Sequence, residues 1–215
     1  MALRVNEIFY SLQGESSLAG RPCVFVRLTG CNLRCVYCDT GYAYEAGEDM
    51  VIEDILTRVD SYGCPLAQVT GGEPLIQAET PLLITRLLDT GHRVLLETNG
   101  SKDVSLVDDR CVRILDVKCP GSGEEENNDW RNLSRLTERD EIKFVLRDRG
   151  DYEFARSVLA RHDFPLDLVK EIHFSPVSGE LALQTLAEWI LSDRLPVRLH
   201  LQLHKIIWGP DARGV

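Results

Sequence analysis

The chain has 215 residues, of which 44% are hydrophobic and 27% charged, a composition typical of one globular domain with a substantial core. Its formal net charge of −10 argues against a nucleic-acid-binding protein, because such a protein needs a basic face to neutralise phosphates. No apolar run approaches the ~18 residues of a membrane span, and the N-terminus lacks an apolar signal segment. We therefore expect a single cytoplasmic domain over residues 1–215, with no nucleic-acid or membrane partner.

Apolar and amphipathic stretches alternate along the chain and predict alternating strands and helices. In chain order, we expect a strand over 23–28, a helix over 52–59, a strand over 66–69, a helix over 81–90, strands over 93–97, 112–117 and 142–146, a helix over 152–159, a strand over 171–174, a helix over 183–190 and a strand over 197–203. The helix over 81–90 is the most sharply delimited, with Thr80 as its N-cap, Pro81 at its first position and Gly91 past its end.

This alternation predicts an α/β fold built on a mainly parallel sheet. In such folds, functional residues gather in loops at the carboxyl ends of the strands. The unusual motifs of this chain follow predicted strands, in the segments Gly30 onward, Thr70–Pro74, Glu97–Gly100 and Ser175–Pro176. The polar segment 121–129 is predicted to be a solvated loop, with a mobile lid as the alternative.

Three of the seven cysteines form a compact C-x3-C-x2-C pattern directly after the first predicted strand. A loop of this length can wrap the thiolates of Cys31, Cys35 and Cys38 around one face of a [4Fe–4S] cluster. The fourth iron then has no protein ligand, unlike the clusters of electron-transfer proteins, and can coordinate a substrate or cofactor. Two other cysteines, Cys23 and Cys111, lie in or beside apolar runs and are expected to be buried.

Structural zinc is the main alternative for the three clustered cysteines, and it requires a fourth Cys or His ligand. No His lies within 50 residues after Cys38, and the sequence has no second C-x2-C pair. A distant cysteine, Cys64, Cys111 or Cys119, would have to fold back to complete the tetrahedron. The sequence leaves this alternative open.

A second motif, Thr-Gly-Gly-Glu-Pro over Thr70–Pro74, follows the next predicted strand. Its glycines let the backbone approach a ligand closely, and strand-end carbonyls together with Glu73 can accept hydrogen bonds from an ammonium group. Alone, the motif would be an ordinary turn. Together with the cysteine pattern and with Tyr37 directly before Cys38, it resembles the signature of the radical S-adenosylmethionine (SAM) superfamily.

Within that superfamily, the chain resembles the 7-carboxy-7-deazaguanine synthase family over almost its whole length. The matching segments are Glu7–Glu15, Gly20–Pro22, Phe25–Arg27, Cys38–Thr40, Glu97–Gly100 and Gln202–Lys205. The resemblance implies a partial (βα) barrel of the radical SAM type with a mainly parallel sheet. It also implies ring contraction of 6-carboxy-5,6,7,8-tetrahydropterin to 7-carboxy-7-deazaguanine with loss of ammonia, in queuosine and 7-deazapurine biosynthesis.

The resemblance further implies the cofactors and partners of the chain. The cofactors are a [4Fe–4S] cluster, SAM and Mg²⁺, and the partners are a reductant such as flavodoxin or ferredoxin and a second copy in a homodimer. The cluster would reduce SAM to give a 5′-deoxyadenosyl radical that takes the hydrogen at C6 of the pterin. Because the radical is generated on the cofactor, no side chain is expected to be catalytic.

The family's site residues carry over to matching positions of this chain. The cluster ligands match Cys31, Cys35 and Cys38, and the Mg²⁺ ligand matches Thr40. The SAM contacts match Tyr37, Cys38, Asp39, Gly72, Asp116, Val117, Lys118, Ser175 and Pro176. The substrate contacts match Leu12, Gln13, Gly14, Glu15, Arg27, Thr70 and His204. A planar guanidinium at Arg27 suits the substrate carboxylate, which it can bind through two hydrogen bonds.

Several of these positions have plain structural alternatives. Arg27 can be a solvent-facing strand residue, Glu15 can face water, and Asp39-Thr40 can cap a helix or form a turn. The chain also departs from relatives that carry Ser-Pro-Lys and Gln-Pro at 116–118 and 175–178. His92, His162 and His173 are expected to be structural or exposed.

The C-terminus is a further departure. Many family members end at or near the proline that matches Pro210, and its carboxylate can join the site. This chain continues over Asp211–Val215, which argues against that contact.

Two other functions stay open at this point. A small radical activase would take a hydrogen from a glycine of a partner protein, and a zinc-stabilised binding module would catalyse nothing. The Gln13-Gly14-Glu15 segment, Arg27 and the Asp39-Thr40 pair favour a carboxylated small molecule over the activase.

Overall fold

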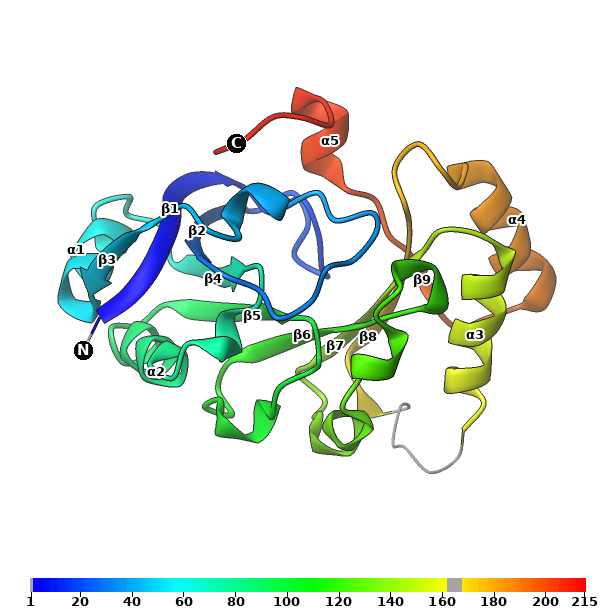
Figure 1. The fold of residues 1–215 in the computed structure, drawn as a ribbon, viewed down its shortest axis with the longest axis horizontal. Coiled ribbons are helices and arrows are strands. Elements are labelled where there is room, and N and C mark those ends of the chain that lie inside the picture. Colours follow the sequence, from blue (N-terminus) through cyan, green and yellow to red (C-terminus); the bar gives the residue numbers. More distant parts are fainter. Residues whose placement is uncertain (1, 162–167) are drawn as a thin grey trace.

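A single nine-stranded sheet forms the centre of the computed structural model, which describes residues 2–161 and 168–215 (Figure 1). The strands are β1 (Ala2–Leu12), β2 (Pro22–Leu28), β3 (Glu48–Val51), β4 (Leu66–Gly71), β5 (Arg93–Thr98), β6 (Val112–Val117), β7 (Glu141–Leu146), β8 (Glu171–Pro176) and β9 (Arg198–Leu199). Their order across the sheet is β3-β1-β2-β4-β5-β6-β7-β8-β9. Among the described residues the edge strands β3 and β9 do not pair with each other, so the sheet is not closed.

The sheet is mainly parallel, as the sequence predicts. Strand β1 pairs antiparallel with β2 and β3, whereas every pairing from β2 to β9 is parallel. The carboxyl ends of β4 to β8 therefore meet along one edge of the sheet, where we expect functional residues. The predicted α/β fold with an open, mainly parallel sheet is confirmed.

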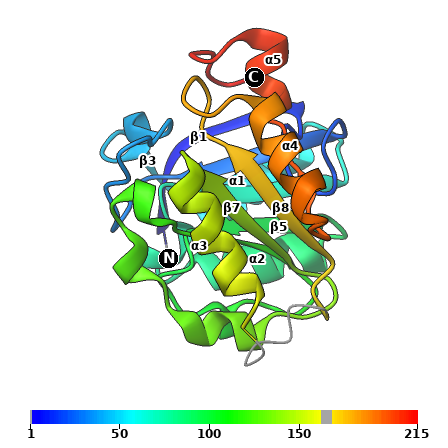
Figure 2. The ribbon, with the colours of Figure 1, turned by 90° about the vertical axis from the view of Figure 1, so that its right-hand side faces the viewer.

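Among the described residues, four helices cover the outer face of the sheet, and a fifth, short helix near the C-terminus has no buried residue. They are α1 (Ile52–Asp60), α2 (Thr80–Asp89), α3 (Arg149–Leu159), α4 (Leu183–Asp193) and α5 (Leu203–Trp208). Helix α1 forms where the sequence predicts it, because Ile52, Ile55, Leu56 and Val59 make one buried face. Figure 2 shows α3 and α4 side by side, and the rings of Tyr152 and Trp189 join them with centroids 5.2 Å apart.

Two apolar clusters fill the space between the helices and the sheet. One lies under α1 and α2 against β1, β2, β4 and β5, and the other lies under α3 and α4 against β6 to β8. Cys23 and Cys111 belong to the first cluster and are fully buried, as predicted. Cys64 is buried in the same cluster and Cys119 in the other, so none of the four isolated cysteines extends towards the clustered three.

Helix boundaries differ from the predictions at two places. Thr80 does not cap α2 but is its first residue, because its hydroxyl donates to the carbonyl of Pro74 at 2.6 Å. Helix α3 begins before residue 152, since the side chain of Asp148 accepts from the backbone N–H of Asp151 and caps the helix there.

The predicted strand over 197–203 is wrong beyond its first residues. Strand β9 ends at Leu199, and α5 begins at Leu203. The chain turns because the backbone N–H of Leu203 donates to the carbonyl of Gly14 at 3.0 Å, which draws the C-terminal segment across the end of β1. Strand β3, which the predictions lack, is an exposed edge strand with no apolar run to indicate it.

The solvated-loop prediction for 121–129 is also wrong in part. The segment contains short 3₁₀ turns and packs on the cysteine-containing loop. The backbone N–H groups of Arg34 and Val36 donate to Glu124 Oε1 at 2.6 Å and to the carbonyl of Ser122 at 3.0 Å. None of the described helices is long and apolar enough to cross a membrane.

Candidate active site

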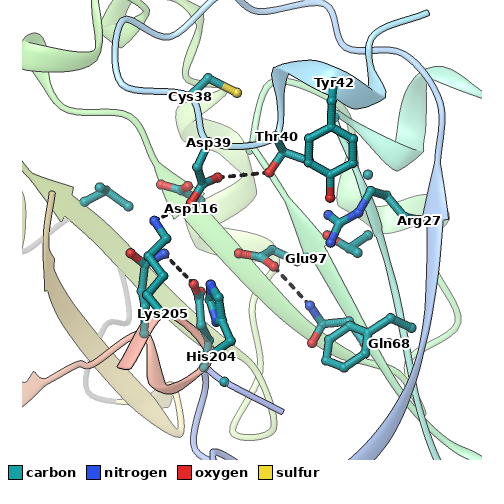
Figure 3. A pocket seen from close by; sticks show the side chains of 18 of the residues that line it. Arg27, Cys38, Asp39, Thr40, Tyr42, Gln68, Glu97, Asp116, His204 and Lys205 are labelled. Atoms are coloured by element: carbon teal, nitrogen blue, oxygen red, sulfur yellow. Dashed lines mark hydrogen bonds and ion pairs between the residues drawn. The ribbon is translucent and has the colours of Figure 1, made fainter. Parts of the chain in front are cut away.

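A cavity of about 250 Å³ opens at the carboxyl ends of the parallel strands. The cysteine-containing loop after β2 forms one wall, and α5 with the C-terminal segment forms another. Sixteen of the predicted site residues line it: Leu12, Gln13, Gly14, Glu15, Arg27, Cys31, Cys35, Tyr37, Cys38, Asp39, Thr40, Thr70, Gly72, Asp116, Lys118 and His204. Segments far apart in the chain therefore meet in one site, part of which is drawn in Figure 3.

Three predicted SAM contacts, all within the described residues, lie outside this cavity. Val117 points into the core beneath α3, since neighbouring residues of a strand face opposite sides and Asp116 faces the cavity. Ser175 is buried beneath His200, and Pro176 lines a neighbouring hollow. The predicted contacts of Val117, Ser175 and Pro176 therefore do not find support in the side-chain arrangement.

The loop that carries the three cysteines is fixed to the end of β4. The backbone N–H of Glu73 donates to the carbonyl of Gly30 at 2.8 Å, and the N–H of Gly30 donates to the carbonyl of Ala43 at 2.9 Å. Gly72 sits so close to the loop that a Cβ atom there would lie 2.5 Å from Cβ of Cys31. Only glycine permits this approach, which explains the glycines of the second motif.

The thiols are suited to a cluster. Sγ of Cys31 accepts from the backbone N–H of Leu33 at 3.4 Å and from Nδ2 of Asn99 at 3.8 Å, contacts that stabilise a thiolate. Burial raises the pKa values of Cys31 and Cys35, and for Cys35 the ammonium of Lys118 opposes that shift. A cationic iron centre would supply the charge that deprotonates them. The cavity-lining position of all three thiols fits a cluster bound at this wall.

A single zinc ion fits the site poorly. Among residues 2–161 and 168–215, no group of three or more His, Cys, Asp or Glu side chains is arranged to hold a single metal ion. Cys64, Cys111 and Cys119 are buried in the core, so they do not supply the fourth ligand that tetrahedral zinc needs. The zinc alternative therefore loses its main requirement.

Glu73 does not face the cavity, which corrects the prediction that its carboxylate accepts from an ammonium group. It is fully buried, and its oxygens accept from the hydroxyl of Thr98 at 2.8 Å and the backbone N–H of Asn99 at 2.6 Å. Burial raises its pKa even though these hydrogen bonds oppose the rise. The carboxylate thus holds the ends of β4 and β5 together, while Gly71 and Gly72 present their backbone to the cavity.

A buried polar network lies at the β1 end of the cavity. Nζ of Lys143 is 2.9 Å from Oε2 of Glu15 and also forms an ion pair with Glu97. Nε2 of Gln68 donates to Oε2 of Glu97 at 3.0 Å, and Gln68 in turn accepts from the side chain of Gln13 (Figure 3). The network aligns amide and carboxylate groups along one wall, which suits a heterocycle with several donors and acceptors.

Charge in this network is stabilised by pairing. Burial alone would raise the pKa of Glu15, but Lys143 and the hydrogen bond from Gln202 together contribute to lowering the pKa well below its usual range. Likewise, burial would lower the pKa of Lys143, but Glu15 and Glu97 raise it. The side chain of Glu15 is 16% exposed, so Glu15 is a largely buried carboxylate that lines the cavity.

Three members of the network, Gln68, Glu97 and Lys143, are absent from the predicted site residues. Each interrupts an apolar strand with a polar side chain, in Leu66–Val69, Arg93–Thr98 and Ile142–Phe144. Polar residues within a strand buried on both faces require partners, so that interruption is the signal that indicates them.

Arg27 lies at the outer end of the same wall. Its Nε donates to Oε1 of Glu7 at 2.7 Å, and that oxygen also accepts from the hydroxyl of Tyr42 at 3.0 Å. The guanidinium carbon is 5.7 Å from the centre of the Tyr42 ring and 5.9 Å from that of Phe9. These contacts orient Arg27 towards the cavity, so it is not the solvent-facing arginine of the alternative.

Asp39 and Thr40 connect the cysteine-containing loop to α5. The hydroxyl of Thr40 donates to Oδ1 of Asp39 at 2.9 Å, and Nζ of Lys205 donates to Oδ2 at 2.6 Å (Figure 3). Partial desolvation would raise the pKa of Asp39, but its pairing with Lys205 and the hydrogen bond from Thr40 together lower it. Thr40 precedes the short turn Gly41–Ala43 without a side-chain capping hydrogen bond, so the capping alternative is wrong.

Polar groups also lie on the side of β6. Oδ2 of Asp116 pairs with Nζ of Lys118 at 2.7 Å, whereas the buried Oδ1 has no hydrogen-bond partner among the described residues. The hydroxyl of Tyr37 donates to the carbonyl of Val145 at 3.2 Å, which leaves the ring to line the cavity. An unpartnered carboxylate oxygen there can accept from a ligand hydroxyl or ammonium.

Of the histidines expected to be structural or exposed, His173 is buried and paired with Glu141 at 2.8 Å, and His92 lies 3.5 Å from Asp60. His162 lies outside the described residues. His200, which the sequence predictions omit, is buried beside Ser16.

The chain is similar in sequence and in fold to known proteins. The Radical SAM superfamily profile matches residues 25–118. The chain is 51% identical over 217 residues to the 7-carboxy-7-deazaguanine synthase of Chlorobaculum tepidum, covering 99% of this chain and 97% of the relative. It is 44% identical over 227 residues to that of Koribacter versatilis, covering 99% and 100%. Its fold resembles the crystal structure of QueE from Escherichia coli, with a TM-score of 0.78, 25% identity and 95% coverage of both chains.

Proposed function

The chain belongs to the 7-carboxy-7-deazaguanine synthase family of the radical SAM superfamily, and on that premise we propose how its cavity serves the family's reaction. The reaction converts 6-carboxy-5,6,7,8-tetrahydropterin to 7-carboxy-7-deazaguanine with loss of ammonia, a step of queuosine biosynthesis. The observation that carries this function is one cavity lined both by the three cysteines and by Arg27 and Glu15.

Cys31, Cys35 and Cys38 would hold the [4Fe–4S] cluster. When bound, the cluster and SAM supply the radical that removes a hydrogen from the substrate. The hydrogen bonds from Leu33 and Asn99 to Sγ of Cys31 keep this thiolate oriented. The side chains around the cavity would bind and orient the substrate and SAM. They would also exclude water, which protects a reactive intermediate.

We propose that SAM lies between the cysteine-containing loop and β6. The backbone of Gly71 and Gly72 and the free Oδ1 of Asp116 support its polar groups from opposite sides. The ring of Tyr37 supplies an apolar surface there. Lys118 is paired with Asp116, so it contributes charge balance and not a free ammonium.

We propose that the pterin lies along the polar network. Gln13, Glu15 and Thr70 face its nitrogen and oxygen atoms, with Leu12, Gly14 and His204 beside them. Arg27 retains terminal guanidinium nitrogens for the substrate carboxylate, because only its Nε is bonded to Glu7. Lys143 keeps Glu15 ionised, so that Glu15 can accept from the amino groups of the pterin.

Mg²⁺, a homodimer and an external reductant are finer parts of the proposal. Thr40 would ligate Mg²⁺ together with substrate oxygens and water, and the carboxylate of Asp39 beside its hydroxyl supports a cation there. Cys38 and Val36 are exposed, which suits electron delivery to the loop by a flavodoxin or ferredoxin. Exposed Ile206, Ile207 and Trp208 on α5 offer an apolar surface to a second copy.

The test of this function is an anaerobic assay of the reconstituted protein with reductant, SAM, Mg²⁺ and 6-carboxytetrahydropterin. We expect 7-carboxy-7-deazaguanine and ammonia in equal amounts, measured by mass spectrometry and an ammonia assay. Cleavage of SAM by a fully loaded cluster without any deazaguanine product would overturn the substrate assignment and leave the superfamily chemistry alone.

A further inference from the structure

The segment after α5 returns over the substrate end of the cavity. Figure 1 shows the chain turning back from α5 so that its C-terminal end lies on the side of β1 and β2. Pro210 and the residues of 212–215 line the same cavity as Arg27. Cζ of Arg213 lies 4.2 Å from the centre of the Tyr42 ring, closer than Cζ of Arg27 at 5.7 Å. The tail, whose continuation past Pro210 argues against a terminal carboxylate at that proline, instead places a second guanidinium at this part of the site.

The cations that line the cavity differ in how they are paired. Four of the five have a carboxylate partner: Arg27 with Glu7, Lys118 with Asp116, Lys143 with Glu15 and Glu97, and Lys205 with Asp39. Among the residues that the structure describes, no carboxylate lies within ion-pair distance of Arg213. Arg213 is thus the one cation lining this cavity that has no ion-pair partner among the described residues.

The ion pairs of the cations beside Tyr42 decide how well this corner of the cavity can accept an anion. The charge of Arg27 is balanced by Glu7, so a substrate carboxylate bound to Arg27 alone would leave the corner with a net charge of about −1. A second cation beside Tyr42 restores neutrality. The ring of Tyr42 favours that cation through its π face, and its hydroxyl is fixed by the hydrogen bond to Glu7.

We propose that Arg213 is a specificity-determining residue that supplies an unpaired positive charge for the carboxylate of the substrate. This inference rests on the proposed function and deepens it. Arg27 sets the geometry of the carboxylate and Arg213 sets the net charge around it. Arg213 is exposed at the cavity mouth, so it also attracts the anion before binding.

The test compares Arg213→Gln with Arg213→Lys, using two ligands that differ in one group. One ligand is 6-carboxytetrahydropterin and the other is the same tetrahydropterin without the 6-carboxylate. Dissociation constants are measured anaerobically on the cluster-loaded protein, and KM and kcat are measured for the carboxylated substrate. Arg58→Gln on α1 is the matched control, since it removes one exposed positive charge away from the cavity.

We expect Arg213→Gln to weaken binding of the carboxylated ligand about tenfold, because the variant removes one positive charge that faces the bound carboxylate. Binding of the ligand without a carboxylate should stay within about twofold, KM should rise and kcat should hold. Arg213→Lys should recover most of the loss, because it keeps the charge. Arg58→Gln should match the unmodified protein.

Equal weakening of both ligands by Arg213→Gln would overturn the proposal and leave the tail a purely structural role. So would unchanged binding of both. Failure of the proposed function gives a different result, because the unmodified protein would then cleave SAM without forming the deazaguanine from the carboxylated substrate.

Discussion

Nε2 of His200 accepts a hydrogen bond from the backbone N–H of Ser16 across 2.8 Å. The contact joins the end of β9 to the loop that carries Glu15. Because a backbone N–H can only donate, Nε2 must be unprotonated, and the ring is neutral. Burial lowers the pKa of His200 from 6.5 to about 4, although the nearby carboxylate of Glu15 opposes that shift.

The neutral state of buried His200 predicts that the free energy of unfolding falls in mild acid. The unfolded chain takes up a proton at His200 near its ordinary pKa, whereas the folded protein resists it until about pH 4. The contribution of neutral His200 to the free energy of unfolding is therefore fully present above about pH 6.5 and is lost as the pH falls towards 4. Between pH 7 and pH 5 this loss is about 2 kcal/mol. Urea unfolding at the two pH values measures it. A His200→Gln variant should show a smaller loss, and an equal loss would contradict the assignment.

The cluster prediction separates the three clustered cysteines from the four buried ones. Cys35→Ala should lose the cluster and all product, since two thiolates do not hold it. Cys64→Ala is the matched control, because Cys64 lies in the core, and it should retain full iron with a small loss of stability. The measurement is the amount of iron and acid-labile sulfide per chain after anaerobic reconstitution, compared between the two variants. Loss of iron from Cys64→Ala would contradict the assignment.

Gly72→Ala tests the close approach of the two motifs. The added Cβ would meet the carbonyl oxygen of Gly30 and Cβ of Cys31, so the cysteine-containing loop must shift. We expect stability to fall by about 1–3 kcal/mol, as overpacking of a rigid contact does, together with a clear loss of bound iron. Gly41→Ala is the control, because its Cβ would come no closer than 3.6 Å to Tyr44. An unchanged iron content in Gly72→Ala would contradict the prediction, because it would show that the cysteine-containing loop can shift without losing the cluster.

Arg27→Lys should retain the cluster but bind the substrate poorly. Lysine keeps the charge and loses the fork that pairs with a carboxylate through two hydrogen bonds. We expect KM to rise about tenfold to a hundredfold, with iron content unchanged. Steady-state kinetics with 6-carboxytetrahydropterin measures it. An unaltered KM would remove Arg27 from the carboxylate site.

Thr40→Val tests the magnesium proposal, with Thr40→Ser as the matched variant. Valine has the shape of threonine without the hydroxyl, so it removes the ligand oxygen, whereas serine keeps it. The Mg²⁺ concentration for half-maximal activity should rise by roughly tenfold or more in Thr40→Val and stay near normal in Thr40→Ser. Titration of activity with Mg²⁺ gives both values. The same response in the two variants would exclude the hydroxyl as a ligand.

The parallel sheet and most of its elements could be predicted because their signals are local. Apolar runs over 66–69 and 112–117 form buried strands, and the spacing of Ile52, Ile55 and Val59 forms α1. Strand β3 and helix α5 could not be predicted. The exposed edge residues of β3 carry no apolar pattern, and α5 depends on a contact with Gly14 that lies far away in the sequence.

The site could be predicted where motifs carry the chemistry, as at the three cysteines and Arg27. The ion pairs and hydrogen bonds of the site could not be predicted where the fold alone brings the two partners together. Lys143 joins Glu15 and Glu97 across the sheet, and nothing in the local sequence specifies those partners. The inward orientation of Glu73 likewise depends on Thr98, a residue of the neighbouring strand.

The hydrogen bond from Leu203 to Gly14 can form only late in synthesis, because residue 203 lies near the end of the chain. Residues 31–38 leave the ribosome long before residue 203, at ordinary elongation rates by roughly ten to thirty seconds. During that interval the cysteines are available while the α5 wall of the cavity does not yet exist. A cluster-assembly machine would therefore have its widest access to the three cysteines in a nascent chain, before α5 and the C-terminal segment complete the wall of the cavity.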